Sequence, residues 1–137
     1  INKKLFGKNK TWRGIFFGII LSIITTFLQK ISSALFHNIE ILNYNEINIL
    51  IFGFLMGFGA LTGDLLKSFI KRRLSILPGK PFLVFDQIDW IIGSLIILNF
   101  YTKIKIEFAI YSILILGTLH FFINIISYNL KIRKTIL

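Results

Sequence analysis

Four long apolar stretches constrain this 137-residue chain more than any other feature. They cover residues 14–36, 48–70, 85–101 and 107–128. At 1.5 Å per residue, each stretch covers or nearly covers the ~30 Å hydrocarbon core of a bilayer, the third being the shortest at about 17 residues. Because backbone polar groups in lipid must be satisfied within the segment, each stretch is expected to form a helix.

The composition supports this interpretation. Hydrophobic residues make up 55% of the chain and 15 residues are Phe, whereas about 45–50% of a soluble domain is apolar. We therefore predict an all-α integral membrane protein, with residues 1–137 forming one domain, a bundle of four transmembrane helices. The basic opening "INKKLFGKNKTWRG" is typical of an interior loop, so a fifth helix is expected ahead of it in the complete protein.

The formal net charge of +10 is distributed unevenly between the connecting segments. Five Lys and Arg residues precede the first stretch, five lie between residues 67 and 80, from the end of the second stretch to the loop before the third, and three close the chain. Only Lys30, Lys103 and Lys105 lie on the opposite side. The positive-inside rule makes the basic side cytoplasmic in a multi-pass cell membrane protein. Orientation thus explains most of the charge without a nucleic-acid partner.

Half of the six carboxylates lie between residues 62 and 90, in and beside the basic segment that joins the second stretch to the third. Asp64 falls about 24 Å along the second stretch, at its cytoplasmic boundary. Asp86 and Asp89 are spaced i, i+3 and share one face at the start of the third. Charged residues at such depth usually face a polar cavity. The absence of cysteine excludes thiolate metal ligands, and the carboxylates offer the oxygen ligands that Mg²⁺ prefers.

Basic side chains in the same loops are candidates for binding phosphate oxygens. Acids for a metal and bases for phosphate indicate a nucleotide or pyrophosphate site.

The same residues also have structural interpretations. Asp86 and Asp89 suit a helix N-cap and a first-turn acid, and the basic run suits membrane orientation alone. Glycines at 53, 57, 59 and 63 most often indicate close helix packing, and His37 and His120 are interpreted as structural. The phosphate-binding candidates are Lys8, Lys10, Lys71, Arg72 and Lys80.

Four linked motifs between residues 8 and 93 resemble those of the CDP-lipid synthases, membrane enzymes that transfer CMP from CTP to a lipid phosphate. "GDLLKSFIKRR" has the form G-D-L-x-x-S-x-x-K-R, "PGKPFLVFDQID" follows with P-G and D-x-x-D, and "GKNKTWRG" resembles a K-[ST]-W-x-G element. "FDQIDW" resembles the CDP-archaeol synthase branch. The longer CDP-diacylglycerol synthases have a K-D pair and a P-G-H-G-G loop that this chain lacks, which also favours the archaeol branch and its five-helix bundle.

The resemblance implies roles for particular residues. Asp64, Asp86 and Asp89 would hold one or two Mg²⁺ ions, and Lys71 and Arg72 would complete the catalytic set. CTP and the lipid phosphate would be the binding partners, with membrane lipids around the helices. The implied substrate-binding residues are Lys8, Lys10, Thr11, Trp12, Ser68 and Lys80.

The implied acceptor is 2,3-bis-O-(geranylgeranyl)-sn-glycerol 1-phosphate, an unsaturated archaeol phosphate. An oxygen of its phosphate would attack the α-phosphorus of CTP and release pyrophosphate. Two alternatives stay open at this point. The same chemistry could act on phosphatidate, since both lipids need only an apolar groove, and a non-enzymatic transporter or assembly subunit could use buried acids to bind or relay cations.

Overall fold

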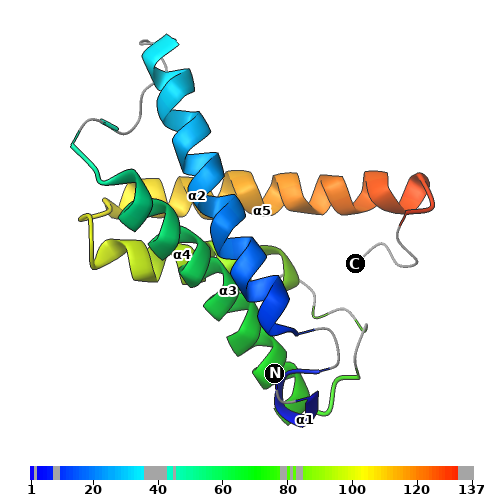
Figure 1. Cartoon of the computed structure of the whole chain (residues 1–137). Coiled ribbons are helices and arrows are strands. Elements are labelled where there is room, and N and C mark those ends of the chain that lie inside the picture. The colour runs from blue at the N-terminus through cyan, green and yellow to red at the C-terminus, as the bar shows by residue number, and fades with distance from the viewer. Residues whose placement is uncertain are drawn as a thin grey trace.

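The computed structural model describes residues 1, 3–7, 10–35, 43, 44, 46–77, 80, 82 and 85–132, except for the side chains of residues 3 and 4. Over these residues the chain is helical and contains no strand, which confirms the predicted all-α class. A short α1 (Lys3–Phe6) precedes four longer helices (Figure 1). These are α2 (Trp12–Leu35), α3 (Ile49–Arg73), α4 (Phe85–Asn99) and α5 (Ile106–Asn129).

The four longer helices match the four predicted stretches, with ends within three residues of those expected. Helices α2, α3 and α5 are long and apolar enough to cross a membrane. Helix α4 has 15 residues, about 22 Å at 1.5 Å per residue, and is shorter than the ~30 Å hydrocarbon core. Three of the four predicted spans therefore have the length and composition of membrane-crossing helices.

Helix α3 has well-defined ends. The Asn48 side chain accepts hydrogen bonds from the backbone N–H groups of Leu50 and Ile51 and so caps the first turn. At the other end Ser75 adopts a positive φ of 59°, and Ile76 N–H donates to the Lys71 carbonyl at 2.9 Å. This backbone pattern is a common helix stop. It leaves three basic residues in the last turn, where the helix dipole favours positive charge.

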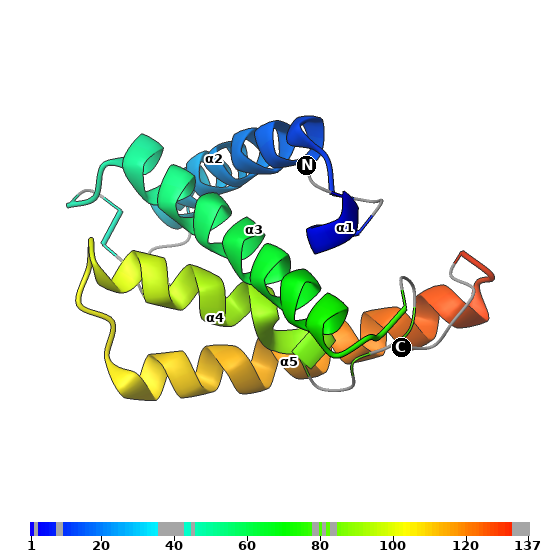
Figure 2. The same ribbon diagram turned by 90° about the horizontal axis from the view of Figure 1, so that it is seen from below.

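The helices pack in the order α2, α3, α4, α5 (Figure 2). Glycines on two faces of α3 allow this close approach. A Cβ atom at Gly53 or Gly57 would lie 2.7 Å from an atom of α2, and a Cβ at Gly59 would lie 2.6 Å from the Gly93 carbonyl oxygen of α4. The glycine spacing therefore serves helix packing, as predicted, but it serves two different partners.

Within the described part of the chain, the packing partner of helix α5 is α4. Asn124 Nδ2 donates a 3.2 Å hydrogen bond to Gln87 Oε1, and both side chains are buried. One turn away, the His120 ring meets Trp90 edge-on, with 6.2 Å between the ring centroids. These contacts agree with a structural role for His120, whereas His37 lies outside the described residues.

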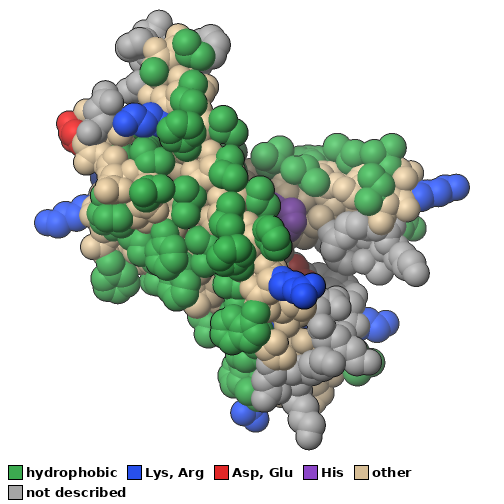
Figure 3. Space-filling model, in the orientation of Figure 1, with side chains coloured by type: hydrophobic (Ala, Val, Ile, Leu, Met, Phe, Trp, Pro, Cys, Tyr) green, Lys and Arg blue, Asp and Glu red, His purple; other side chains and the backbone are tan. Residues whose placement is uncertain are grey.

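Polar groups are concentrated inside the molecule, and large apolar side chains cover its outside. Buried polar residues include Ser68, Lys71, Ser94 and Gln87. In Figure 3 apolar side chains spread over the visible face of α2, where Phe16 and Leu21 are each more than half exposed. Such a surface is unfavourable in water but suits helices surrounded by lipid.

Candidate active site

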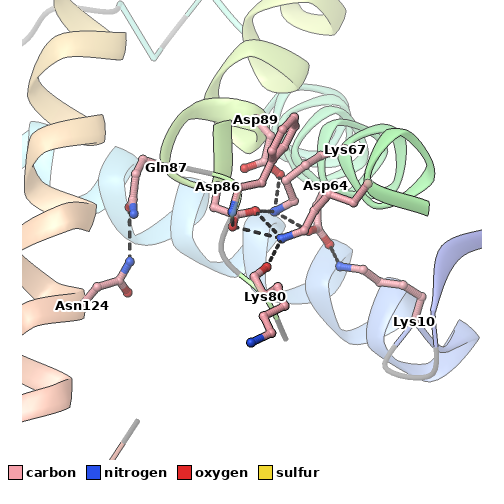
Figure 4. A network of polar contacts seen from close by, with 10 residues as sticks. Lys10, Asp64, Lys67, Lys80, Asp86, Gln87, Asp89 and Asn124 are labelled. Atoms are coloured by element: carbon pink, nitrogen blue, oxygen red, sulfur yellow. Dashed lines mark hydrogen bonds and ion pairs between the residues drawn. The ribbon is translucent and has the colours of Figure 1, made fainter. Parts of the chain in front are cut away.

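Three carboxylates from two helices meet around one ammonium group (Figure 4). Lys67 Nζ on α3 lies 3.2 Å from Asp64 Oδ1, 3.3 Å from Asp86 Oδ1 and 3.0 Å from Asp89 Oδ2. We call Asp64, Asp86, Asp89 and Lys67 the carboxylate cluster. The sequence prediction that Asp64 approaches the other two acids from a neighbouring helix is confirmed by these distances.

The glycine packing between α3 and α4 explains this meeting. Gly63 immediately precedes Asp64, and a Cβ atom added to it would collide with the Asp89 carbonyl group. With no side chain at 63, the two backbones approach closely enough for carboxylates on different helices to share one cation. The helix crossing thus determines the site geometry.

Asp89 is the most buried acid of the cluster. Its side chain is 7% exposed, against 30% for Asp64 and 21% for Asp86. Asp89 Oδ1 is buried and has no hydrogen-bond partner among the described residues. Asp89 Oδ2 is also buried; it forms an ion pair with Lys67, but the two groups are not aligned as a hydrogen bond. An anionic oxygen in this condition is costly unless a cation approaches it.

Lys71 lies one turn after Lys67 and joins the cluster to the loop before α4. Its buried Nζ lies 3.1 Å from Asp86 Oδ2 and donates a 2.7 Å hydrogen bond to the Lys80 carbonyl. Asp86 Oδ2 also accepts a 2.7 Å hydrogen bond from Phe82 N–H. These contacts fix the loop against the end of α3.

Lys10 approaches the cluster from the start of α2 and forms an ion pair with Asp64. Beside this pair lies a pocket of about 160 Å³. Thr11 Oγ1 accepts a 3.1 Å hydrogen bond from Gly14 N–H, which caps α2 and shapes the pocket wall. The pocket lining combines polar and apolar groups: Ile1, Lys10, Thr11, Gly14, Ile15, Leu61, Asp64 and Leu65.

Other predicted site residues lie outside the cluster contacts. Arg72 donates to the Ile76 carbonyl, and Ser68 is buried within α3. Trp12 is 72% exposed at the start of α2. The Lys80 side chain is exposed and points away from the carboxylates in Figure 4, so only its backbone is joined to the site. Lys8 lies outside the described residues.

A family profile described as CarS-like, CDP-archaeol synthase, matches residues 2–136 of this chain. The chain belongs to the CDP-archaeol synthase family. A CDP-archaeol synthase of Methanococcus aeolicus is 33% identical over 133 residues, which are 96% of this chain and 74% of the relative. One from Staphylothermus marinus is 36% identical over 96% of this chain and 70% of the relative. One from Methanococcus vannielii is 38% identical over 96% of this chain and 75% of the relative. No solved structure matches the chain.

The sequence analysis missed Lys67 as a site residue of this CDP-archaeol synthase family member. It falls on an unspecified position, x, between the G-D and S-x-x-K-R elements of the motif, so the motif did not mark it. Its i, i+3 spacing from Asp64 was the available signal. The capping alternative for the acids also needs revision. Asp86 does lie in the first turn of α4, but its carboxylate contacts the Lys67 and Lys71 ammonium groups and accepts a hydrogen bond from Phe82 N–H.

Proposed function

We propose that this chain transfers CMP from CTP to an isoprenoid ether lipid phosphate, 2,3-bis-O-(geranylgeranyl)-sn-glycerol 1-phosphate, and so produces CDP-archaeol and pyrophosphate. The observation that carries the proposal is the carboxylate cluster, set at the basic end of α3 in a chain of the CDP-archaeol synthase family. The relatives bear the name of this activity. A small polar site at the edge of an apolar helix assembly suits a polar nucleotide and a lipid acceptor.

In this reaction an oxygen of the lipid phosphate attacks the α-phosphorus of CTP. The new P–O bond forms while the bond from the α-phosphorus to the bridging oxygen of the β-phosphate breaks, and pyrophosphate leaves. A phosphate ester with a second pKa of about 6 is already mostly ionised near neutral pH, so a strong general base is unnecessary. The protein contributes mainly positioning and charge neutralisation.

The residues around the cluster fit these two tasks. Lys10 and Lys71 bring positive charge to it through their ion pairs with Asp64 and Asp86 respectively. Each ammonium can exchange a carboxylate partner for an anionic phosphate oxygen of CTP. Arg72 lies at the same end of α3 and adds charge for the leaving pyrophosphate. The pocket beside Lys10, partly apolar and partly polar, suits the junction between a lipid chain and its phosphate.

Asp64, Asp86 and Asp89 are proposed to hold Mg²⁺. Their oxygen donors are those Mg²⁺ prefers, and the unpartnered, buried Asp89 Oδ1 supplies a donor that needs a cation. In their present positions, the described His, Asp and Glu side chains do not form a group of three that could hold a metal. When bound, the metal would neutralise charge on the transferring phosphoryl group.

We also propose a multi-pass location in the cell membrane with the cluster on the cytoplasmic side. The ends of the helices near the cluster hold most of the described basic residues, including the last turn of α3. The positive-inside rule assigns that side to the cytoplasm, where CTP is available.

The decisive experiment uses purified protein in lipid nanodiscs with radiolabelled CTP, Mg²⁺ and one of two acceptors, the geranylgeranyl ether phosphate or phosphatidate. We expect CDP-lipid and equimolar pyrophosphate with the ether lipid and much slower turnover with phosphatidate. Omission of Mg²⁺ or acceptor should stop both products. Faster turnover with phosphatidate would change the assigned acceptor, and no CDP-lipid from either acceptor would refute the proposed function.

A further inference from the structure

Lys67 holds an unusual position for a lysine in a site built to bind anions. Its Nζ is within 3.3 Å of carboxylate oxygens from Asp64, Asp86 and Asp89, and its side chain is only 16% exposed. No other described lysine is ion-paired to all three acids. Lys10 is paired only with Asp64, and Lys71 only with Asp86. Lys67 therefore holds acids of α3 and α4 together.

The distances distinguish this ammonium from a metal ion. The three carboxylate oxygens lie 3.0–3.3 Å from Lys67 Nζ, whereas Mg²⁺ binds oxygen at about 2.0–2.1 Å. A metal held by all three acids would need them about 1 Å closer to a common centre, and Lys67 Nζ now occupies that centre. The ammonium and the metal cannot occupy it together, because their charges repel and their volumes overlap.

We propose that Lys67 is an internal counter-cation that exchanges with the divalent metal of this site. Without metal, Lys67 neutralises the three acids and keeps them in position; on metal binding, its ammonium leaves the centre and the acids close on the ion. Lysine suits this role because a flexible stem carries its compact charge. The inference rests on the metal site proposed above, but not on the cytidylyl transfer reaction. Lys67 is a positioning residue in it.

Exchange has two measurable consequences. The protein must displace its own cation to bind metal, so Lys67 lowers the affinity for metal. Removal of this charge should strengthen metal binding, whereas removal of a lysine that merely supports the fold or the metal ligands should weaken it or leave it unchanged. In the wild type, metal binding should release Lys67 Nζ from its ion pairs and make it more reactive.

The first test measures Mn²⁺ affinity by electron paramagnetic resonance in purified protein without nucleotide. We expect Lys67→Gln to bind Mn²⁺ about tenfold or more tightly than wild type, because a positive charge within a few ångströms of the metal is gone. Lys67→Arg keeps the charge and should remain close to wild type. Lys10→Gln, which removes a charge from one acid only, should give a smaller gain, and the exposed Lys103→Gln should give none.

The second test needs no substitution and therefore does not depend on the folding of a variant. Wild-type protein is acetylated briefly with acetic anhydride, with and without saturating Mn²⁺, and each lysine is quantified by mass spectrometry. We expect the acetylation rate of Lys67 to rise at least threefold with Mn²⁺ while that of Lys103 stays constant.

The outcomes separate this inference from the proposed function. Unchanged or weaker Mn²⁺ binding by a folded Lys67→Gln protein, equal gains in Lys67→Gln and Lys10→Gln, or metal-independent acetylation of wild-type Lys67 would each overturn the exchange. Wild-type synthesis of CDP-lipid in the same preparation would leave the proposed function standing. Metal-dependent release of Lys67 without any CDP-lipid synthesis would instead support the exchange and refute the function.

Discussion

Replacement of Gly59 by Ala tests whether the crossing of α3 and α4 positions the active site. The added Cβ would lie 2.6 Å from the Gly93 carbonyl oxygen and 2.7 Å from Ser94 Cα, both backbone atoms of α4. Ordinary van der Waals contact begins near 3.4 Å. Since backbone cannot rotate away as a side chain can, the two helices must separate locally by about 0.8 Å.

That separation has an energetic cost that can be assigned from the contacts. Overpacking costs about 1–3 kcal/mol. The 3.1 Å hydrogen bond from Ser94 Oγ to the Met56 carbonyl also crosses this interface, and stretching it costs about 1 kcal/mol. Alanine returns about 1 kcal/mol through its higher helix propensity. We therefore expect Gly59→Ala to destabilise the protein by about 1–3 kcal/mol.

The Gly59→Ala substitution should also lower turnover in protein that remains folded. Gly59 is about 7.5 Å along α3 from Asp64, so separation of the helices there also separates Asp64 from Asp86 and Asp89. A displacement near 1 Å in a site of this kind costs about 10²-fold in rate. We expect a loss of that order in CTP-dependent CDP-lipid synthesis by protein that still shows a cooperative thermal transition.

Gly117→Ala is the matched control. Its Cβ would meet only the Ile88 side chain, at 3.1 Å, and that side chain can move. This variant should keep wild-type turnover and equal or greater thermal stability. Wild-type turnover by Gly59→Ala, at equal protein concentration in nanodiscs, would refute the claim that the glycine crossing determines the site geometry.

Three further predictions concern charge and orientation. Asp89→Asn keeps the shape of the side chain but removes one unit of ligand charge, so CDP-lipid synthesis should fall by at least ~10²-fold, with partial recovery at raised Mn²⁺; near-normal turnover at low Mg²⁺ would refute the metal role. Arg72→Ala should raise the KM for CTP more than Arg73→Ala, because the Arg73 guanidinium lies 5.1 Å over the Phe69 ring. Equal changes in KM in steady-state kinetics would contradict this prediction and indicate a merely electrostatic patch. A cysteine at Asn43 should react with an impermeant maleimide from outside cells while a reporter fused after Leu137 stays cytoplasmic, and the reverse pattern would refute the proposed orientation.

The sequence by itself determined the helices and their limits. Long apolar runs bounded by charge require helices in lipid. The start of α3 at its N-cap Asn48 and its end before Ser75 both depend on local residues. It also determined the location of the chemistry, because ionisable residues are rare in such runs and three of the six acids fall within one segment. Helix ends and the set of acids were therefore predictable from local physics.

Only the tertiary structure decided which helix faces meet. The lipid-facing and packed faces of α3 are both apolar, so hydrophobic periodicity could not assign Gly53 and Gly57 to α2 or Gly59 and Gly63 to α4. The tertiary structure likewise determined that Lys67 is the cation at the centre of the three acids. Its partners Asp86 and Asp89 lie on another helix, and a lysine's partner is determined by distance in space, which sequence spacing does not encode beyond one helix.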